Sequence, residues 1–238
     1  MARVQEVSAT DSMLRGVVFD LDGVIVDSHP LHRRAWREFL SYIGKEVSES
    51  DLEFILEGRR RREILVHFLG VLSESEIQEY GRKKDEFFRQ ASTDLKPVCG
   101  SVEFIKILKK AGFCMGVATS ASQKRAYWTL QHLDLADCFE VVVSGDEVPM
   151  GKPDPAIYLL AASRLSLRPE SLLSIEDSVS GIRSAKTASF RCIGIAVEEN
   201  ARQLVQAGAD HVVPNLRNLS IRDLQQFFAA GYSDIEPV

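Results

Sequence analysis

The chain has 238 residues, of which 45% are hydrophobic and 26% charged, and it carries a formal net charge of -5. This length and composition are typical of a globular protein with one large domain, or with a main domain that carries a smaller insert. The acidic balance gives no overall positive field that would gather nucleic acid or an anionic membrane surface, so we expect neither as a partner. An anionic ligand would therefore have to be held by local positive groups.

The sequence also bears on the location of the protein and on the redox state of its cysteines. No apolar run approaches the roughly 20 residues of a membrane-spanning helix, and residues 1–15 lack the apolar segment of a signal peptide. The cysteines are dispersed singly among apolar neighbours, without the spacing of a metal finger or a CxxC pair: Cys99, Cys114, Cys138 and Cys192. We expect a cytoplasmic protein with reduced, buried thiols that is a monomer, with a dimer as the alternative.

The first predicted strand, at residues 15–20, ends in two acids and a glycine. Because side chains along a strand alternate between its faces, Asp20 and Asp22 can point the same way, and Gly23 can begin a sharp turn. Two carboxylates in one site are unfavourable unless a cation or a proton neutralises them, so the pair indicates chemistry. The structural alternative is a buried strand with two acids in its turn.

A helical region follows this strand. From Pro30 to Gly44 apolar residues recur at the spacing of an amphipathic helix, with Pro30 in its first turn and Gly44 after its end. Three more helical patterns follow without a strand-like run between them, at 52–56, 64–70 and 77–91. We therefore expect residues 29–93 to form a helical domain inserted into a core domain made of residues 1–28 and 94–238.

Strand-like and helical segments then alternate. Strands are expected at 113–119, 139–143, 171–176, 191–195 and 211–213, and helices at 101–111, 122–133, 155–165, 178–188, 200–207 and 221–229. This alternation predicts right-handed βαβ units and an α/β fold, with a Rossmann-like parallel sheet and helices on both faces.

Ligands of such sheets bind beyond the carboxyl ends of the strands, so the residues at those ends are informative. Asp20 and Asp22 follow the first strand, and three further polar clusters follow later ones: Thr119-Ser120, the loop that reaches Lys152, and Glu176-Asp177. Acids, hydroxyls and one lysine are thus predicted to meet at one edge of the sheet.

In this order the four clusters resemble the motifs of the haloacid dehalogenase superfamily of phosphotransferases, and the resemblance covers residues 16–213. The motifs stand as Asp20-Leu21-Asp22-Gly23, Thr119-Ser120, Gly151-Lys152-Pro153-Asp154-Pro155 and Glu176-Asp177-Ser178. The later match His32-Arg33-Arg34-Ala35-Trp36 points to the β-phosphoglucomutase-like branch, whose small helical cap resembles the helical insert.

The resemblance implies roles for the core residues. Asp20 would attack phosphorus and form an aspartyl-phosphate, and Asp22 would be the general acid and base. Ser120 would donate its hydroxyl to phosphate oxygens, with Thr119 and Ala121 in the same substrate-binding loop, and Lys152 would offset negative charge on Asp20 and the phosphoryl group.

The resemblance also implies a metal site. A hard divalent cation with oxygen ligands suits these acids, and Mg²⁺ tolerates a few carboxylates together with waters and phosphate oxygens. The expected ligands are Asp20, the backbone carbonyl of Asp22, and Asp177, with Glu176 as a fourth if the mutase-like branch is followed. The structural alternative for Glu176-Asp177 is a strand-end acid and a helix N-cap before Ser178.

In the helical insert, His32 aligns with a histidine that contacts the acid/base aspartate in mutase relatives, and a solvated helical histidine is the alternative. Arg59-Arg60-Arg61-Arg62 is a dense positive cluster in which Arg61 matches a substrate contact, although most such runs are solvated faces. Gly58 and Arg89 are further candidates for substrate contacts.

These observations favour a Mg²⁺-dependent phosphatase of small phosphorylated metabolites such as sugar or polyol phosphates. The alternative is a β-phosphoglucomutase, which passes the phosphoryl group to a sugar hydroxyl, but Glu57 and Gln123 stand where the mutase has lysines. A catalytically inactive binding module on the same fold is a third hypothesis. The acids, Ser120 and Lys152 are all present, which argues against it.

Overall fold

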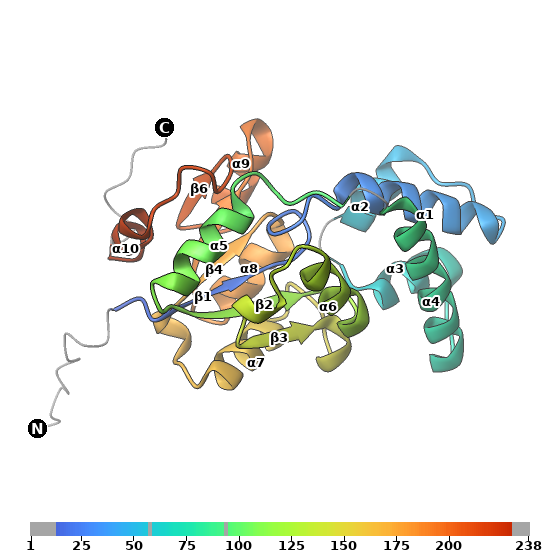
Figure 1. Cartoon of the computed structure of the whole chain (residues 1–238). Helices are drawn as coiled ribbons and strands as arrows, with labels where there is room; N and C mark the ends of the chain where they lie inside the picture. The colour runs from blue at the N-terminus through green and yellow to red at the C-terminus, as the bar shows by residue number, and fades with distance from the viewer. Residues whose placement is uncertain (1–12, 57–58, 93–94, 230–238) are drawn as a thin grey trace, which may run out of the picture.

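The computed structural model describes residues 13–56, 59–92 and 95–229 (Figure 1). Six strands form one parallel sheet in the order β3-β2-β1-β4-β5-β6. They are β1 (Gly16–Phe19), β2 (Cys114–Thr119), β3 (Val141–Ser144), β4 (Leu172–Glu176), β5 (Arg191–Ile195) and β6 (His211–Val213). Because β1 lies between β2 and β4, the residues that follow β1 emerge in the middle of the carboxyl edge, where side chains from both neighbours can reach them.

Helices cover both faces of the sheet. On one face, Val17 and Phe19 pack in a core with α5 (Ser101–Lys110), α6 (Gln123–His132) and α10 (Ile221–Ala229). On the other face, Val18 packs with α7 (Ala156–Leu165), α8 (Val179–Thr187) and α9 (Glu198–Gln206). The alternation of Val17, Val18 and Phe19 between the two cores follows from the period of a strand, and both faces of the strand are apolar because both are buried. We call this part of the molecule the sheet unit.

The described residues between β1 and α5 contain four helices, which we call the helical unit: α1 (His29–Tyr42), α2 (Glu49–Leu56), α3 (Arg61–Leu69) and α4 (Glu74–Ala91). Figure 1 shows them grouped together at one side of the sheet. They have an apolar core of their own, in which Trp36 and Phe39 of α1 pack with Leu52, Leu65 and Ile77. Two stretches of chain, one after β1 and one before α5, connect this unit to the sheet.

Sequence features explain where the helices begin and end. Pro30 lies in the first turn of α1, and Gly44 follows its end with a left-handed φ of +76°. At the start of α4, the hydroxyl of Ser73 accepts a hydrogen bond from the amide of Glu76, whose carboxylate accepts from the amide of Ser73. This capping box satisfies two backbone donors at the start of the helix.

The predicted fold class is confirmed, and most predicted element bounds lie within two residues of the observed ones. The strand predicted at 139–143 begins instead at Val141, because a short 3-10 turn at Ala136–Cys138 precedes it. The expectation of four buried thiols is confirmed only for Cys192 on β5. Cys99, in the turn before α5, is exposed, and Cys114 and Cys138 are half-buried. None of the described helices is long and apolar enough to span a bilayer.

Candidate active site

A cleft separates the carboxyl edge of the sheet from the helical unit. Its volume, counted with the solvent at its mouth, is about 660 Å³. Residues predicted from all four strand-end clusters line it, together with residues of the helical unit and of the start of α6: Asp20, Asp22, His29, His32, Trp36, Ile55, Leu56, Arg59, Arg61, Ile64, Lys84, Asp85, Ser120, Ala121, Ser122, Arg125, Lys152 and Asp177. The polar side chains predicted to meet at one edge do meet there, facing the helical unit.

Asp20 and Lys152 form a buried ion pair at the floor of the cleft. The Lys152 ammonium donates to Asp20 Oδ1 at 2.7 Å and to Glu176 Oε1 at 2.5 Å. Burial raises the pKa of Asp20, the Lys152 charge opposes this rise, and the negative charges of Glu176, Asp177 and Asp22 add to it. Burial opposes the charge on Lys152, yet Asp20 and Glu176 raise its pKa above the usual value. One ammonium group therefore faces several carboxylates, which leaves local negative charge in excess.

Glu176 is fully buried and held by donors on both of its oxygens. Oε1 accepts from Lys152 and, at 2.6 Å, from the Tyr158 hydroxyl; Oε2 accepts from the Asp177 amide and the Ser178 hydroxyl at 3.2 and 3.3 Å. A Cβ at Gly181 would lie 2.0 Å from this carboxyl group. Glycine at that position on α8 therefore makes room for the Glu176 side chain.

Three carboxylates of this region could hold a metal ion. Asp20, Glu176 and Asp177 each offer an oxygen, and these oxygens all lie within 4.8 Å of one another. Oxygen-only donors and excess negative charge suit a hard divalent cation. Glu176 can contribute an oxygen only by giving up one of its protein donors, so Asp20 and Asp177 fit the role of ligands more readily.

His29, the first residue of α1, lies against Asp177. Its Nε2 is 2.6 Å from Asp177 Oδ2. Burial lowers the pKa of His29, but the hydrogen bond and the charge of Asp177 outweigh it and raise the pKa to about 9. Gly23, with φ of +76°, leaves the space that both groups use, since a Cβ there would lie 1.7 Å from Asp177 Oδ2 and 2.5 Å from His29 Nε2.

Asp22 has a different environment from Asp20. Arg125 binds both of its oxygens, with distances of 2.8 Å to Oδ1 and 2.5 Å to Oδ2, and the Ser28 hydroxyl donates to Oδ1 at 2.6 Å. Burial by itself would raise the pKa of Asp22, but the Arg125 charge and the hydrogen bonds from Arg125 and His32 hold it well below the usual range. Asp22 is therefore an ionised carboxylate that Arg125 holds through both oxygens, with Ser28 and His32 adding contacts to Oδ1.

His32 and Lys84 connect Asp22 to the helical unit. Lys84 Nζ lies 3.0 Å from His32 Nδ1, and His32 Nε2 lies 3.3 Å from Asp22 Oδ1. Burial and the Lys84 charge lower the pKa of His32 to about 3, while burial and the Arg125 charge lower the pKa of Lys84 to about 7. We assign the neutral tautomer in which Nδ1 accepts from Lys84 and Nε2–H donates to Asp22, because these partners require it.

The loop after β2 contributes a hydroxyl-bearing residue to the lining of the cleft. Ser120 and Ala121 line it, whereas Thr119 is fully buried beneath them and its Oγ1 accepts from the Ala121 amide at 3.1 Å. Thr119 thus shapes the loop rather than facing the cleft.

The candidate residues of the helical unit differ in position. Arg61 lines the cleft and binds Asp85 at 2.8 Å. Arg60 instead donates to the Val148 carbonyl at 2.9 Å and so ties α3 to the sheet unit. Arg89 is exposed and is not among the residues that line the cleft, because it projects from the solvent side of α4. Gly58 and Glu57 lie outside the described residues.

Sequence reasoning did not single out three residues that contact these groups, namely Arg125, Lys84 and His29. The sequence does contain a signal for Lys84, since this residue falls within the apolar stripe of the helical pattern at 77–91, where a lysine is unusual. Arg125 lies in the first turn after the second strand-end cluster, near enough to the sheet edge to reach a neighbouring strand's residues. Neither signal identifies the partner.

Comparisons with known proteins agree with this geometry. Residues 17–195 match the family described as haloacid dehalogenase-like hydrolase. The chain is 37% identical over 200 residues to the phosphorylated carbohydrates phosphatase of Thermotoga maritima, which covers 82% of this chain and 92% of that protein. It is 29% identical over 222 residues to the β-phosphoglucomutase of Bacillus subtilis, covering 90% and 95% of the two chains.

A solved structure shows the same likeness in three dimensions. The β-phosphoglucomutase of Clostridium difficile superimposes with a TM-score of 0.79 and 26% sequence identity, over 91% of this chain and 97% of that one. Fold, strand-end residues and relatives agree, and the chain belongs to the haloacid dehalogenase superfamily, in its β-phosphoglucomutase-like branch.

Proposed function

We propose that this protein is a Mg²⁺-dependent phosphatase of small phosphorylated metabolites such as sugar or polyol phosphates. The observation that carries the proposal is the asymmetry of two carboxylates in one cleft, since Asp20 is paired with Lys152 and Asp22 with Arg125. Two acids in distinct environments suit a nucleophile and a proton carrier.

In the first half of the reaction, an oxygen of Asp20 bonds to phosphorus while the bond from phosphorus to the leaving oxygen breaks, and Asp22, after taking up a proton from solvent, donates it to that oxygen. In the second half, water bonds to phosphorus as Asp22 takes its proton, and the Asp20–phosphorus bond breaks to free phosphate. Lys152, 2.7 Å from Asp20, would neutralise charge as the phosphoryl group arrives. The Ser120 hydroxyl would donate to a phosphoryl oxygen.

Mg²⁺ would be held by Asp20, Asp177 and the backbone carbonyl of Asp22, with Glu176 as a further ligand if it exchanges a donor. The ion would lower the repulsion between these carboxylates and the phosphate dianion. The excess negative charge on the floor of the cleft supports this assignment.

The helical unit would act as a cap domain, with residues 29–93 inserted between the two parts of a core domain, 1–28 and 94–238. Its residues His32, Arg61 and Lys84 line the cleft opposite the sheet edge, a placement that suits selection of the leaving group and exclusion of water.

A panel of phosphorylated metabolites tests the phosphatase proposal. With Mg²⁺ at neutral pH, we expect phosphate release from sugar or polyol phosphates, a loss of at least about a thousandfold in Asp20→Asn, and loss of activity on chelation. Mg²⁺-dependent phosphate release by Asp20→Asn at near the wild-type rate would refute the assignment of Asp20 as nucleophile.

The second candidate is a β-phosphoglucomutase, which the fold-level likeness and the Bacillus subtilis relative favour. The two activities share the aspartyl-phosphate and differ in the acceptor. β-Glucose 1-phosphate with a trace of the 1,6-bisphosphate separates them, because a mutase forms glucose 6-phosphate without releasing phosphate. That product without free phosphate would replace the phosphatase proposal by the mutase.

A further inference from the structure

Asp85 is an acidic side chain of the cleft that the proposed reaction does not use. Among the described residues that line the cleft, it is the acid that the helical unit contributes, from α4. Its side chain is 23% exposed. A carboxylate in a cleft for phosphate esters opposes the binding of the ligand, because like charges repel more strongly in a partly buried site than in water. The position of Asp85 therefore bears on which esters the cleft accepts.

Asp85 pairs with Arg61 inside the cleft. Asp85 Oδ2 accepts from Arg61 Nη1 at 2.8 Å and from the Ser122 hydroxyl at 3.4 Å. Arg61 Nη2 also lies 3.9 Å from Asp146 Oδ1 of the sheet unit. The guanidinium charge of Arg61 is thus balanced by carboxylates of the protein itself. Because Ser122 lines the cleft two positions after Ser120, the pair borders the space that a leaving group would fill.

Two further cations of the helical unit line the cleft. Lys84 is 3% exposed, and its ammonium group lies 3.0 Å from His32 Nδ1. The guanidinium carbon of Arg59 lies 4.3 Å from the ring centre of Phe54. Arg61 is paired with a carboxylate of the cleft lining, so the charge of that carboxylate controls how strongly the Arg61 position attracts an anion.

A second phosphate and a hydroxyl group would meet this pair differently. A phosphate dianion can bind Arg61 either beside Asp85 or by displacing that carboxylate, which is then left half-buried without its cation; both are unfavourable. A hydroxyl group can accept from the guanidinium and donate to the carboxylate, so it matches the pair without a change of charge. The pair therefore favours an uncharged leaving group that carries hydroxyl groups.

We propose that Asp85 is a specificity residue that keeps Arg61 neutralised, so that the cleft accepts phosphate esters with an uncharged, hydroxyl-bearing leaving group and rejects esters whose leaving group carries a second phosphate. This inference rests on the phosphatase proposal and narrows its substrate class. It also separates the two candidate activities, because a mutase must hold a sugar bisphosphate in the same cleft.

Kinetics on a matched pair of esters test the proposal. We would compare kcat/KM for fructose 1,6-bisphosphate with kcat/KM for fructose 6-phosphate, or use the corresponding pair for the sugar phosphate that the wild type hydrolyses fastest. The ratio of bisphosphate to monophosphate should rise about tenfold or more in Asp85→Asn, which keeps the shape of the side chain and removes its charge. It should return to near the wild-type value in Asp85→Asn with Arg61→Gln, because the gain depends on a released guanidinium group.

Glu79→Gln is the matched control, since it removes the same charge from an exposed position of α4 and should keep the wild-type ratio. An unchanged ratio in Asp85→Asn would overturn the proposal. A ratio that rises as much in the double variant as in Asp85→Asn would reflect a general charge effect and overturn it as well. In both cases, hydrolysis of the monophosphate by the wild type leaves the phosphatase proposal standing.

Binding provides a readout that needs no turnover. In an Asp20→Asn background with Mg²⁺, calorimetry would give the Kd of each ester with and without Asp85→Asn, and thermal unfolding would confirm that each variant is folded. Asp85→Asn should tighten binding of the bisphosphate about fivefold or more and that of the monophosphate less than about twofold. Equal tightening of both esters would overturn the specificity role. If the wild type hydrolyses no ester of the panel, the phosphatase proposal fails, and these binding constants still show whether Asp85 discriminates against a second phosphate.

Discussion

Asp20 and Asp22 are two residues apart, yet different parts of the molecule determine their surroundings. Asp20 contacts Lys152, which also binds Glu176, and all three belong to the sheet unit. Asp22 contacts Arg125 of the sheet unit and also His32, which Lys84 supports from the helical unit. The Asp20 side is therefore complete within one unit, while the Asp22 side depends on how two units meet.

This difference has a physical origin. Asp20 and Lys152 lie at the floor of the cleft with side chains at most 10% exposed, where carboxylates and an ammonium group persist only as mutual partners. Asp22 lines the same cleft, but its side chain is 19% exposed and its partners come from both units. A carboxylate that is paired within one unit therefore stands beside a carboxylate that is held where two units meet.

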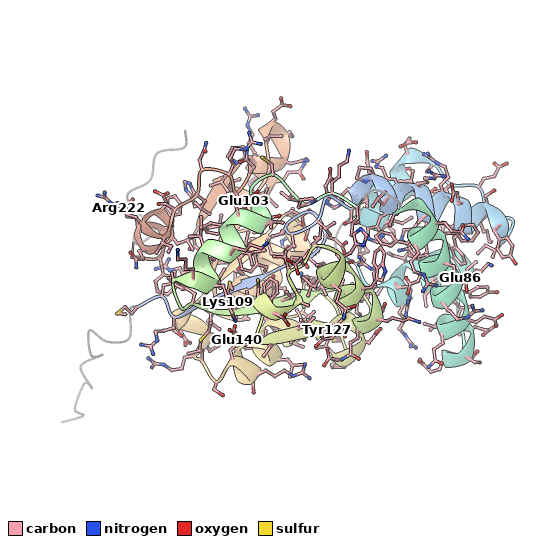
Figure 2. All side chains as sticks on the ribbon, viewed as in Figure 1. Glu86, Glu103, Lys109, Tyr127, Glu140 and Arg222 are labelled. Carbon is pink, nitrogen blue, oxygen red and sulfur yellow. The ribbon has the colours of Figure 1, made fainter. Side chains whose placement is uncertain are left out.

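The largest expected effect concerns the buried pair on the Asp20 side. Lys152→Met leaves Asp20 and Glu176 without their shared cation, so the free energy of unfolding should fall by about 3–5 kcal/mol. Urea unfolding at pH 7 measures this loss. Lys109→Met is the control, because Lys109 forms an exposed pair with Glu140 at 2.8 Å on the outer surface (Figure 2) and should lose less than about 1 kcal/mol. Equal losses in the two variants would remove the distinction between buried and exposed pairs.

The next effect concerns Lys84 on the Asp22 side. Its pKa is about 7 in the folded protein against an ordinary 10.5, so between these values the unfolded chain binds more protons and the folded state gains stability as pH rises. Relative to Lys84→Met, the wild type should therefore gain up to about 1.4 kcal/mol per pH unit from pH 7 upward. Unfolding free energies measured from pH 7 to 10 check this slope.

Lys83→Met is the matched control for that measurement, because Lys83 is the neighbouring residue on α4 and pairs with Glu86 at 3.1 Å at the helix surface. A difference between wild type and Lys84→Met that is independent of pH would contradict the buried, weakly basic ammonium group inferred here.

Replacing one helical glycine in each unit by alanine compares the sheet unit with the helical unit. Gly181→Ala would place a Cβ 2.0 Å from the Glu176 carboxyl group, which four donors hold, so stability should fall by about 3 kcal/mol. Gly81→Ala would place a Cβ 2.4 Å from Arg61 Nε, the end of a flexible side chain that can move away. The gain in helix propensity, about 1 kcal/mol, should then make Gly81→Ala neutral or stabilising. Thermal unfolding of both variants measures the sign, and the same sign in both would contradict the comparison.

The smallest loss expected among the contacts of Glu176 is that of Tyr158→Phe. It removes one hydrogen bond of 2.6 Å to Glu176 while Lys152 remains in place, so stability should fall by about 1.5 kcal/mol. Urea unfolding is again the measurement. A loss as large as that of Lys152→Met would mean that the hydroxyl, rather than the ammonium group, holds Glu176.

Local patterns predicted most of the architecture. The apolar run before Asp20, the helical spacing that begins at Pro30 and the later alternation of strands and helices each reflect short-range periodicity, which is visible along the chain. The convergence of Asp20, Ser120, Lys152 and Asp177 was predictable as well, because parallel strands place their carboxyl ends at one edge.

By itself, then, the sequence determined the elements, their order and the strand-end residues that face the cleft. The pairings were decided only by tertiary structure: Arg125 with Asp22 across 103 positions of the chain, and Lys84 with His32 across 52. The exposure of Arg89 and the burial of Thr119 were likewise set by packing. The reason is that a side chain's partner depends on distances between elements, and those distances are set when the cores on the two faces of the sheet and the core of the helical unit pack together.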